Sequence, residues 1–359
     1  MQIVIRADSG FEIGTGHMMR CLTLANALRN NGHDIFFVSK PHTGNIIDKV
    51  KQNNFDYATL TINDTPYDDL YHSRWLGSSQ MDDATQTVGI INQCIKKSVD
   101  LIIVDHYAID HRWEEILKQH TKKILVIDDL ADRKHNCDYL LDQTFMRTKQ
   151  DYQSLLPKNC QLMLGSQFAL LRPEFIKPLE LIQQIRLKSK SQMATHILVM
   201  MGGTDPLNVS AKVLDALLLD KKNKKITVVL GPTAPHYDSV KAYCEHDKRI
   251  TIMSDISNVA ELMLSHDICI GAAGTTSLER CSMGLPSILV AFAENQIPIL
   301  TMLGNFGAVI VFTLEDSHEQ ILSKLNYLRT PENYQRMTER CLEVCDGKGV
   351  KKVIDILIT

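Results

Sequence analysis

The fold that the sequence predicts is decided by the stretch MQIVIRADSGFEIGTGHMMRCLTLANALRNNG, residues 1–32. An apolar run from Ile3 leads directly into a glycine-rich segment, which is typical of a buried strand that ends in a turn. Beyond the turn, apolar residues recur at helical spacing from Met18 to Leu28, and Gly32 marks the end of the predicted helix. A strand, a glycine-rich loop and a helix in this order form the first unit of an open parallel sheet.

The same alternation continues along both halves of the chain. Further strands are predicted at the apolar runs that begin at residues 34, 100, 123, 137, 196, 224, 267 and 285. Helical patterns separate several of these runs, and continuous apolar strands that alternate with helices indicate a parallel sheet covered on both faces. Since about 150 residues per domain is usual, a chain of 359 residues is too long for one core. The sequence therefore predicts an α/β protein of two domains.

The domain boundaries are predicted from composition. An N-terminal domain is expected over residues 1–170 and a C-terminal domain over residues 194–345. Between them, residues 171–193 hold two prolines followed by polar and basic residues, a composition typical of a linker. The pattern from Ser317 onward is largely helical, and the last helix, residues 346–359, could pack back on the N-terminal domain.

Composition excludes several classes of protein. The formal net charge is −3 and no long run of like charge occurs, so no nucleic-acid partner is predicted. The nine cysteines form no CxxC pair and are expected to be reduced thiols, while no Cys and His cluster suggests a metal site. The first ten residues do not have the pattern of a signal peptide, and no apolar run approaches the ~18 residues of a transmembrane helix. A cytoplasmic monomer without membrane partners is expected.

The first loop places Gly14, Gly16 and His17 where a strand ends and a helix begins. Ligands of open parallel sheets bind at this end of the strands, and glycines let the backbone approach them closely. The loop does not match the dinucleotide pattern GxGxxG, and Lys40 ends the next strand where an acidic ribose ligand would be needed. A NAD site is therefore not expected. His17 is a candidate functional residue, and the alternative is a packed or solvated histidine.

Two loops of the C-terminal half also follow predicted strands. Small and hydroxylic residues there offer backbone N–H groups, which suits a diphosphate. The Walker A pattern GxxxxGK[ST] is absent, so ATP hydrolysis by that route is not expected. Glu279 lies one turn into the predicted helix that follows the second of these loops, and its carboxylate can accept hydrogen bonds from ribose hydroxyl groups or simply balance the helix dipole. The candidate binding residues of these loops are Gly203, Thr204, Gly274, Thr275, Thr276, Ser277 and Glu279.

Polar residues follow three other predicted strands. Asp105, His106 and Tyr107 end one strand of the first half and are expected to face the same region as the first loop. Asp128 and Asp129 end another, but adjacent strand residues point to opposite faces, so no metal site is expected there. A polar cluster suited to sugar hydroxyl or amide groups, or else a solvated loop, follows the last predicted strand. It consists of Glu294, Asn295 and Gln296.

Several of these segments resemble one known family. The UDP-2,4-diacetamido-2,4,6-trideoxy-β-L-altropyranose hydrolases of pseudaminic acid biosynthesis (the PseG family) have segments similar to IRADSGFEIGTGHMMRCLTLANAL, VDHY, MMGGTDP, GAAGTTSLERCSMGLPSI and AENQ. The resemblance covers nearly the whole chain. It implies the GT-B fold of MurG-type glycosyltransferases, in which the parallel sheets of two Rossmann-like domains face a central cleft. The chain is longer than the shortest members of the family, mostly around residues 67–87 and in the predicted linker.

The resemblance also implies roles for individual residues. His17 matches the base of the family, and Tyr107 matches an active-site partner. Glu279 matches the ribose-binding glutamate of MurG-like proteins, and Asn295 matches a polar position near the sugar. No cofactor and no metal are implied. The residues expected to line the diphosphate are Gly203, Thr204, Thr275 and Thr276.

The implied reaction is hydrolysis of a UDP-activated sugar at the anomeric carbon. UDP is a good leaving group, so the reaction needs charge stabilisation, which helix N-termini at the second and third loops can supply. His17 would deprotonate a water on the face opposite UDP, and the anomeric centre would be inverted. Three alternatives stay open: a MurG-like glycosyltransferase, a UDP-sugar 2-epimerase, or a sugar-nucleotide-binding protein without catalysis. The residues do not define the stereochemistry of the sugar.

Overall fold

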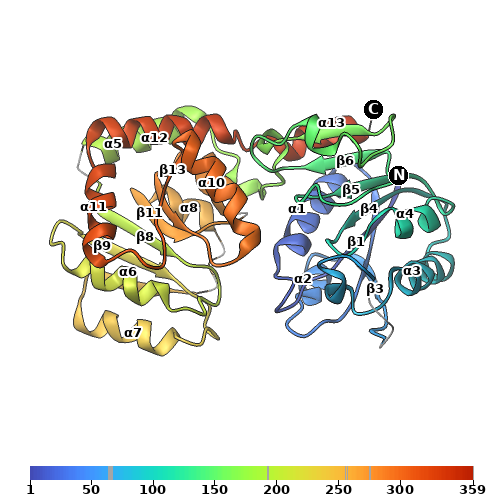
Figure 1. Ribbon diagram of the computed structural model, residues 1–359, viewed down its shortest axis with the longest axis horizontal. Helices are drawn as coiled ribbons and strands as arrows, with labels where there is room; N and C mark the ends of the chain where they lie inside the picture. Colours follow the sequence, from blue (N-terminus) through green and yellow to red (C-terminus); the bar gives the residue numbers. More distant parts are fainter. Residues whose placement is uncertain (64–67, 192–193, 255, 257, 275, 359) are drawn as a thin grey trace. The chain divides into compact units, whose positions relative to one another are not determined.

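The computed structural model describes residues 1–63, 68–191, 194–254, 256, 258–274 and 276–358 (Figure 1). The chain forms two compact units, one from Met1–Arg172 with Lys348–Thr359 and the other from Pro173–Gly347. Each unit contains one sheet in which every strand pair is parallel, with helices packed against it. The predicted α/β class with parallel sheets is thus confirmed.

The first unit holds a seven-stranded sheet in the order β3-β2-β1-β4-β5-β6-β7. Its strands are β1 (Gln2–Ala7), β2 (Asp34–Ser39), β3 (Asp56–Thr59), β4 (Val99–Asp105), β5 (Thr121–Ile127), β6 (Tyr139–Asp142) and β7 (Gln161–Leu164). The apolar runs predicted all of these except β3 and β7. Both are edge strands of four residues with exposed positions, so neither carries the continuous apolar run of a central strand.

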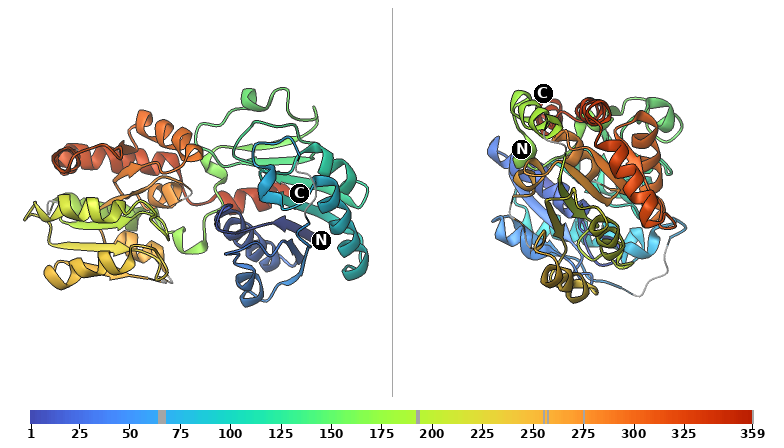
Figure 2. Two further views of the ribbon diagram at one scale, coloured as in Figure 1. Left: turned by 60° about the horizontal axis from the view of Figure 1, so that its bottom comes forward. Right: turned by 90° about the vertical axis from the view of Figure 1, so that its left-hand side faces the viewer.

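Two apolar layers cover the sheet of the first unit. Ile3 and Ile5 of β1 belong to one layer with buried side chains of α1 and α13, whereas Val4 belongs to the other with side chains of α3 and α4. Helix α13 lies beside α1 (Figure 2). It begins at Gly349, which passes so close to Ala169 that a Cβ atom would lie 2.3 Å from the carbonyl oxygen of Ala169. The helices of this unit are α1 (Gly16–Asn30), α2 (Ile47–Gln52), α3 (Gln80–Cys94), α4 (His111–Leu117) and α13 (Gly349–Leu357).

The second unit holds a six-stranded sheet in the order β10-β9-β8-β11-β12-β13. Its strands are β8 (His196–Met200), β9 (Lys225–Val229), β10 (Ile250–Met253), β11 (Ile268–Ala272), β12 (Ser287–Val290) and β13 (Val309–Val311). The edge strands β10 and β13 were not predicted, and they are again short and partly exposed. The helices are α5 (Leu179–Ser191), α6 (Val209–Leu218), α7 (Tyr237–His246), α8 (Val259–Leu264), α9 (Thr276–Ser282), α10 (Ile297–Phe306), α11 (His318–Leu328) and α12 (Pro331–Val344).

Residues 171–193, interpreted above as a linker, contain helix α5, which packs against α12 of the second unit. The guanidinium of Arg186 is buried and donates hydrogen bonds to the backbone oxygens of Met283, His266 and Met263. A buried charge that binds three carbonyl groups is costly to remove, so this part of the segment is an integral piece of the second unit.

Two observations concern the cysteines and the apolar helices. The nine cysteines are thiols outside any disulfide, and six of them are buried. Within the described ranges, every helix lacks the combination of length and apolarity that crossing a bilayer requires.

Candidate functional site

The carboxyl ends of β1 and β4 meet at one edge of the first sheet. The strands pair with Ala7 opposite Asp105, so the loop after β1 and the residues after β4 lie side by side. Within this loop Gly14 has a φ of 78°, a left-handed conformation that favours glycine, and forms a short antiparallel bridge with Gly10. Helix α1 then begins, and the second residue of its first turn is His17. Local geometry thus directs a histidine toward the end of β4.

His17 is paired with a carboxylate. Its Nδ1 lies 2.6 Å from Oδ1 of Asp105, whose side chain is fully buried. Arg20, one helical turn after His17, binds the same carboxylate through Nε at 2.6 Å and Nη2 at 2.7 Å. Burial alone would raise the pKa of Asp105, but the charge of Arg20 and the hydrogen bonds from Arg20 and His17 outweigh it and hold this pKa well below its usual range. Asp105 is therefore ionised, and the Nδ1–H of His17 donates to it.

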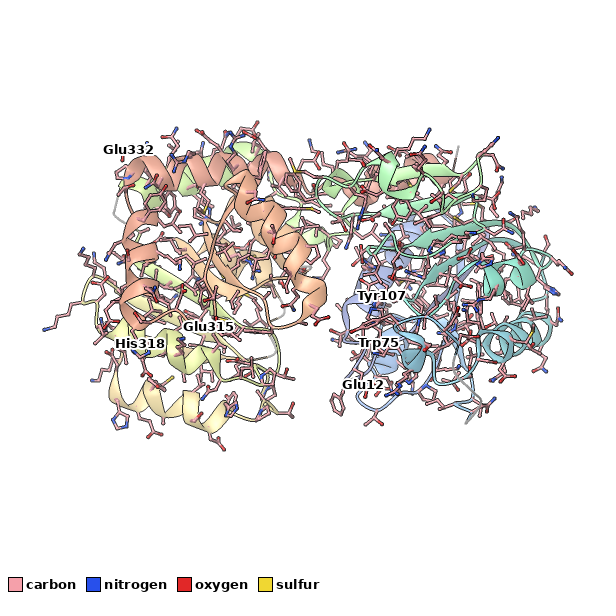
Figure 3. All side chains as sticks on the ribbon, in the orientation of Figure 1. Glu12, Trp75, Tyr107, Glu315, His318 and Glu332 are labelled. Carbon is pink, nitrogen blue, oxygen red and sulfur yellow. The ribbon has the colours of Figure 1, made fainter. Side chains whose placement is uncertain are left out.

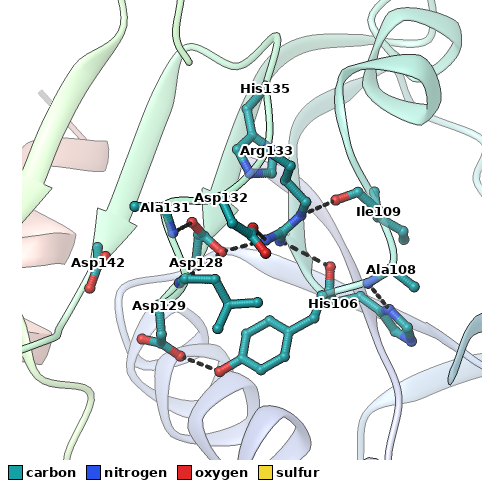
Figure 4. A network of polar contacts seen from close by, with 12 residues as sticks. His106, Ala108, Ile109, Asp128, Asp129, Ala131, Asp132, Arg133, His135 and Asp142 are labelled. Carbon is teal, nitrogen blue, oxygen red and sulfur yellow. Dashed lines mark hydrogen bonds and ion pairs between the residues drawn. The ribbon is translucent and has the colours of Figure 1, made fainter. Parts of the chain in front are cut away.

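A second carboxylate joins Arg20 to Tyr107. Arg20 Nη1 donates to Oδ2 of Asp129 at 2.5 Å, and the Tyr107 hydroxyl donates to the same oxygen at 2.9 Å (Figure 4). The ring of Tyr107 meets the ring of His17 edge-on, with centroids 4.5 Å apart. Burial and the charge of Asp129 raise the pKa of Tyr107 well above its usual value, so the phenol stays protonated. One guanidinium thus connects the histidine and the tyrosine through two carboxylates.

The structure brings together three of the predicted residues, His17, Asp105 and Tyr107, but separates His106 from them. The sequence suggested that Asp105 contacts a ligand. Both of its oxygens instead accept hydrogen bonds from protein donors and its side chain is inaccessible, so Asp105 supports His17. His106 is buried as well, and its Nδ1 accepts a hydrogen bond from the backbone N–H of Ala108 at 3.0 Å. Burial lowers the pKa of His106 to about 4. Its predicted substrate contact is corrected in the same way.

A buried charge cluster lies behind the first loop. Arg6 donates to Asp8 at 2.6 Å and to Asp83 at 2.6 Å, and all three side chains are inaccessible to solvent. Lys40 lies 3.0 Å from Asp83, and its backbone N–H donates to Asp8 at 2.7 Å. His106 Nε2 is 3.3 Å from Asp8, within ion-pair distance but without hydrogen-bond geometry. Because buried charges are stable only when paired, this cluster fixes the ends of β1 and β2.

The site of the first unit is completed by Asp129, which the sequence analysis considered only in excluding a metal site, and by residues that it did not single out. Arg20 and Asp129 hold the histidine and the tyrosine, and His72 and Trp75 approach Tyr107 from a separate segment, as Figure 3 shows for Trp75. Arg20 could have been predicted from the sequence, because it stands three residues after His17 in the predicted helix and so lies on the same helix face. The others come from distant parts of the chain, and no local pattern connects them.

In the second unit, two predicted loops follow the neighbouring strands β8 and β11. Gly202 has a φ of 85° and Gly274 a φ of 140°, conformations that favour glycine. Gly203 and Thr204 are exposed. The Gly203 carbonyl accepts a hydrogen bond from Gly231 N at 2.9 Å, and a Cβ atom at Gly231 would lie 2.5 Å from that oxygen. Backbone groups are thus held at this edge of the sheet by close packing.

Asp205 changes the interpretation of the second loop. Its carboxylate accepts hydrogen bonds from the backbone N–H groups of Val209 at 2.9 Å and Ser210 at 2.8 Å. The N-terminus of α6 is therefore already capped by a negative charge, and the predicted use of this terminus for a diphosphate is corrected. The exposed backbone of residues 202–204 is still available to a ligand.

The remaining predicted residues lie at the ends of β11 and β12. Ser277 is buried, and its hydroxyl accepts from Gly274 N at 3.2 Å, so it shapes the loop. Gln296 accepts a hydrogen bond from Phe292 N at 2.8 Å. Thr276 and Glu279 are partly exposed in α9, and Glu294 is exposed. Thr275 lies outside the described residues, as does the side chain of Asn295.

The acidic pair after β5 binds protein groups on opposite sides. Asp128 accepts from Arg133 at 2.8 Å and from the Tyr152 hydroxyl at 2.7 Å, whereas Asp129 faces Tyr107 (Figure 4). The charges of Arg133 and His135 outweigh burial and keep the pKa of Asp128 below its usual range. In the part of the chain that the structure describes, no group of three or more His, Cys, Asp and Glu side chains has a metal-binding arrangement.

The chain is similar to known proteins along most of its length. The glycosyltransferase family 28 C-terminal domain matches residues 196–355. The UDP-2,4-diacetamido-2,4,6-trideoxy-beta-L-altropyranose hydrolase of Campylobacter jejuni is 25% identical over 86% of this chain and 97% of its own length. An uncharacterized protein of Methanocaldococcus jannaschii is 28% identical over 82% of this chain, which spans only 57% of that protein.

The fold is also found among solved structures. The crystal structure of MurG from Acinetobacter baumannii superposes with a TM-score of 0.69 at 13% identity, covering 99% of this chain and 98% of that one. The two units therefore form a GT-B fold of two Rossmann-like domains, as the resemblance implied. The resemblance to the hydrolase from Campylobacter, first stated on short motifs, is confirmed over most of the sequence.

Proposed function

We propose that this protein, which has the GT-B fold and is similar to a UDP-sugar hydrolase, is an enzyme that acts on a UDP-activated sugar. The substrate is a UDP-2,4-diacetamido-2,4,6-trideoxy sugar of pseudaminic acid biosynthesis, and the reaction is hydrolysis at the anomeric carbon. The observation that carries this proposal is the pairing of His17 with the buried carboxylate of Asp105. It supplies the base that hydrolysis needs and that simple nucleotide binding does not.

His17 is the general base. Its Nδ1–H is donated to Asp105, so the lone pair of the imidazole is on Nε2 and can accept a proton from water. Arg20 holds the carboxylate of Asp105 in place through two hydrogen bonds, so the acceptor that orients the imidazole is itself fixed. Such an oriented base typically contributes 10²–10⁴-fold to a rate.

Tyr107 positions a ligand through its oxygen. Its hydroxyl proton is donated to Asp129, so the phenol oxygen can only accept a further hydrogen bond. A water or an amide N–H of the substrate fits this acceptor. The edge-on contact with His17 sets the orientation of the acceptor relative to the base.

The second domain binds the UDP. The backbone of residues 202–204 and the loop at Gly274–Thr276 contact the diphosphate, and Glu279 accepts the ribose hydroxyl groups, with Glu294, Asn295 and Gln296 near the sugar. Charge developing on the leaving diphosphate is stabilised by these backbone N–H groups, so the reaction proceeds without a metal. Water attacks the anomeric carbon while the bond between this carbon and the UDP oxygen breaks, so the anomeric configuration is inverted. His17 accepts the proton of the attacking water, and UDP leaves with the bonding electrons. The enzyme is a cytoplasmic monomer.

A glycosyltransferase is the second candidate, because the family that matches residues 196–355 is a glycosyltransferase domain. One experiment separates the candidates: NMR of the purified protein with a panel of UDP-sugars and no acceptor. Hydrolysis is supported if free sugar with inverted configuration is released and if ¹⁸O from labelled water is incorporated into that sugar. An unchanged UDP-sugar supports a transferase or a binding protein, an epimeric product supports a 2-epimerase, and label in UDP means attack at phosphorus.

A further inference from the structure

Residues 68–79 form a segment that is anchored at its ends and beside it. The backbone N–H of Gln80 donates to Asp68 at 2.7 Å, and Asp69 forms an ion pair with Arg112 at 2.8 Å. Leu76 is 1% exposed in the core, and its carbonyl accepts a hydrogen bond from Lys40 Nζ at 2.7 Å. The short 3₁₀ helix Ser73–Leu76 is therefore held in place. Nothing in these anchors requires an aromatic side chain.

Two aromatic rings of this segment, His72 and Trp75, nevertheless pack together with Tyr107. Trp75 stacks on Tyr107 with centroids 6.0 Å apart and planes 28° apart. His72 lies 4.3 Å from Trp75 and 5.5 Å from Tyr107. Both His72 and Trp75 are partly exposed, so they are not core residues as Leu76 is. The rings present an aromatic surface that continues, through Tyr107, to the imidazole of His17 at 4.5 Å.

We propose that His72 and Trp75, together with Tyr107, form an aromatic platform that contacts the sugar of the substrate and selects sugars with an apolar face. The proposal rests on the proposed function, since it places the reacting sugar at His17. A deoxygenated C6 and N-acetyl methyl groups present C–H groups in place of hydroxyl groups. Contact between such C–H groups and an aromatic face lowers the free energy of binding. A hydroxyl group placed there loses its hydrogen bonds to water, which opposes binding.

The electrostatics of His72 suit this role. Burial lowers the pKa of His72, and Arg133 and His17 lower it further against the opposite influence of Asp132. The imidazole is therefore neutral near pH 7 and offers an apolar ring face. A protonated ring would carry strongly bound water and would disfavour a methyl group at the same place.

The first test measures specificity. We expect Trp75→Leu to lower kcat/KM for the diacetamido trideoxy UDP-sugar about 10-fold through KM, because one aromatic contact of about 1.4 kcal/mol is lost. Binding of UDP alone stays unchanged, and Trp75→Phe keeps most of the activity. Tyr57→Leu, a substitution of an exposed aromatic residue in β3 of the same domain, is the control. An unchanged KM for Trp75→Leu, or an equal loss of UDP binding, overturns the proposal.

The second test needs no turnover and so separates the two proposals. The chain has two tryptophans, Trp75 and the fully buried Trp113, so acrylamide quenching of fluorescence reports mainly on Trp75. The sugar nucleotide, added to the His17→Asn variant to prevent turnover, should protect Trp75 from acrylamide, whereas UDP should not. Protection by UDP alone, or none by the sugar nucleotide, contradicts the platform. A wild-type protein that shows protection but releases no sugar contradicts hydrolysis and leaves the platform supported.

Discussion

The two domains share a topology but use the carboxyl ends of their strands in opposite ways. In the first domain these ends carry charged side chains that bind one another, as Arg20 does with Asp105 and Asp129. In the second, glycines and exposed backbone follow the strands, and the buried carboxylate of Asp205 caps a helix. Fixed side chains suit proton transfer, and exposed backbone N–H groups suit an anion. The difference supports the proposal that chemistry and nucleotide binding are divided between the domains.

The comparison is tested most strongly by His17→Asn. We expect kcat to fall 10²–10⁴-fold because the base is lost, while the amide can still bond to Asp105. Binding of UDP, measured by calorimetry, should be unchanged, since it is assigned to the second domain. Full activity of this variant would remove His17 from the mechanism.

Asp105→Asn tests whether the paired carboxylate matters beyond the histidine itself. Removing a buried charge that faces Arg20 should lower stability by about 3–5 kcal/mol, and kcat should fall about 100-fold as His17 loses its orientation. Asp100→Asn is the control, since Asp100 lies at the other end of β4 in a surface ion pair with Lys122, worth about 0–1 kcal/mol. Equal behaviour of the two variants would refute the assigned role of Asp105.

Gly231→Ala tests the second domain alone. The new methyl group would lie 2.5 Å from the Gly203 carbonyl oxygen, so the loop after β8 must move. We expect a loss of about 1–3 kcal/mol in stability and about 10-fold weaker UDP binding. Gly89→Ala in α3, where a Cβ atom meets open space, should instead stabilise the protein by about 0.5–1 kcal/mol. Unchanged UDP affinity in Gly231→Ala would contradict the assignment of the diphosphate to this loop.

The smallest effect concerns Asp142, near the charge network of the first domain. Burial and the charge of Asp129 raise its pKa to about 6 from the model-peptide value near 3.8. A raised pKa in the folded state favours the protonated form, so the stability it contributes is complete below pH 4 and is lost as pH rises through 6. Relative to Asp142→Asn, the wild-type free energy of unfolding should fall by about 1–3 kcal/mol over this window, as measured by urea unfolding. A difference that does not change with pH would show that Asp142 ionises normally.

Much of the fold could be predicted because central parallel strands are buried on both faces and so leave continuous apolar runs. The edge strands β3, β7, β10 and β13 could not, since they are short and partly exposed. Helix α5 was interpreted as a linker because its polar, basic composition hid the buried Arg186 that attaches it to the second domain.

The sequence by itself determined the glycine-rich loops at strand ends and the placement of His17 at the start of α1, because strand, turn and helix are adjacent in the chain. Only the tertiary structure decided what His17 binds. The register of β1 against β4 brings Asp105 to it, and the residues after β5 supply Asp129 to Arg20 and Tyr107. These partners are separated by many residues, and side-chain pairs at such separations are created by strand order and not by local propensity.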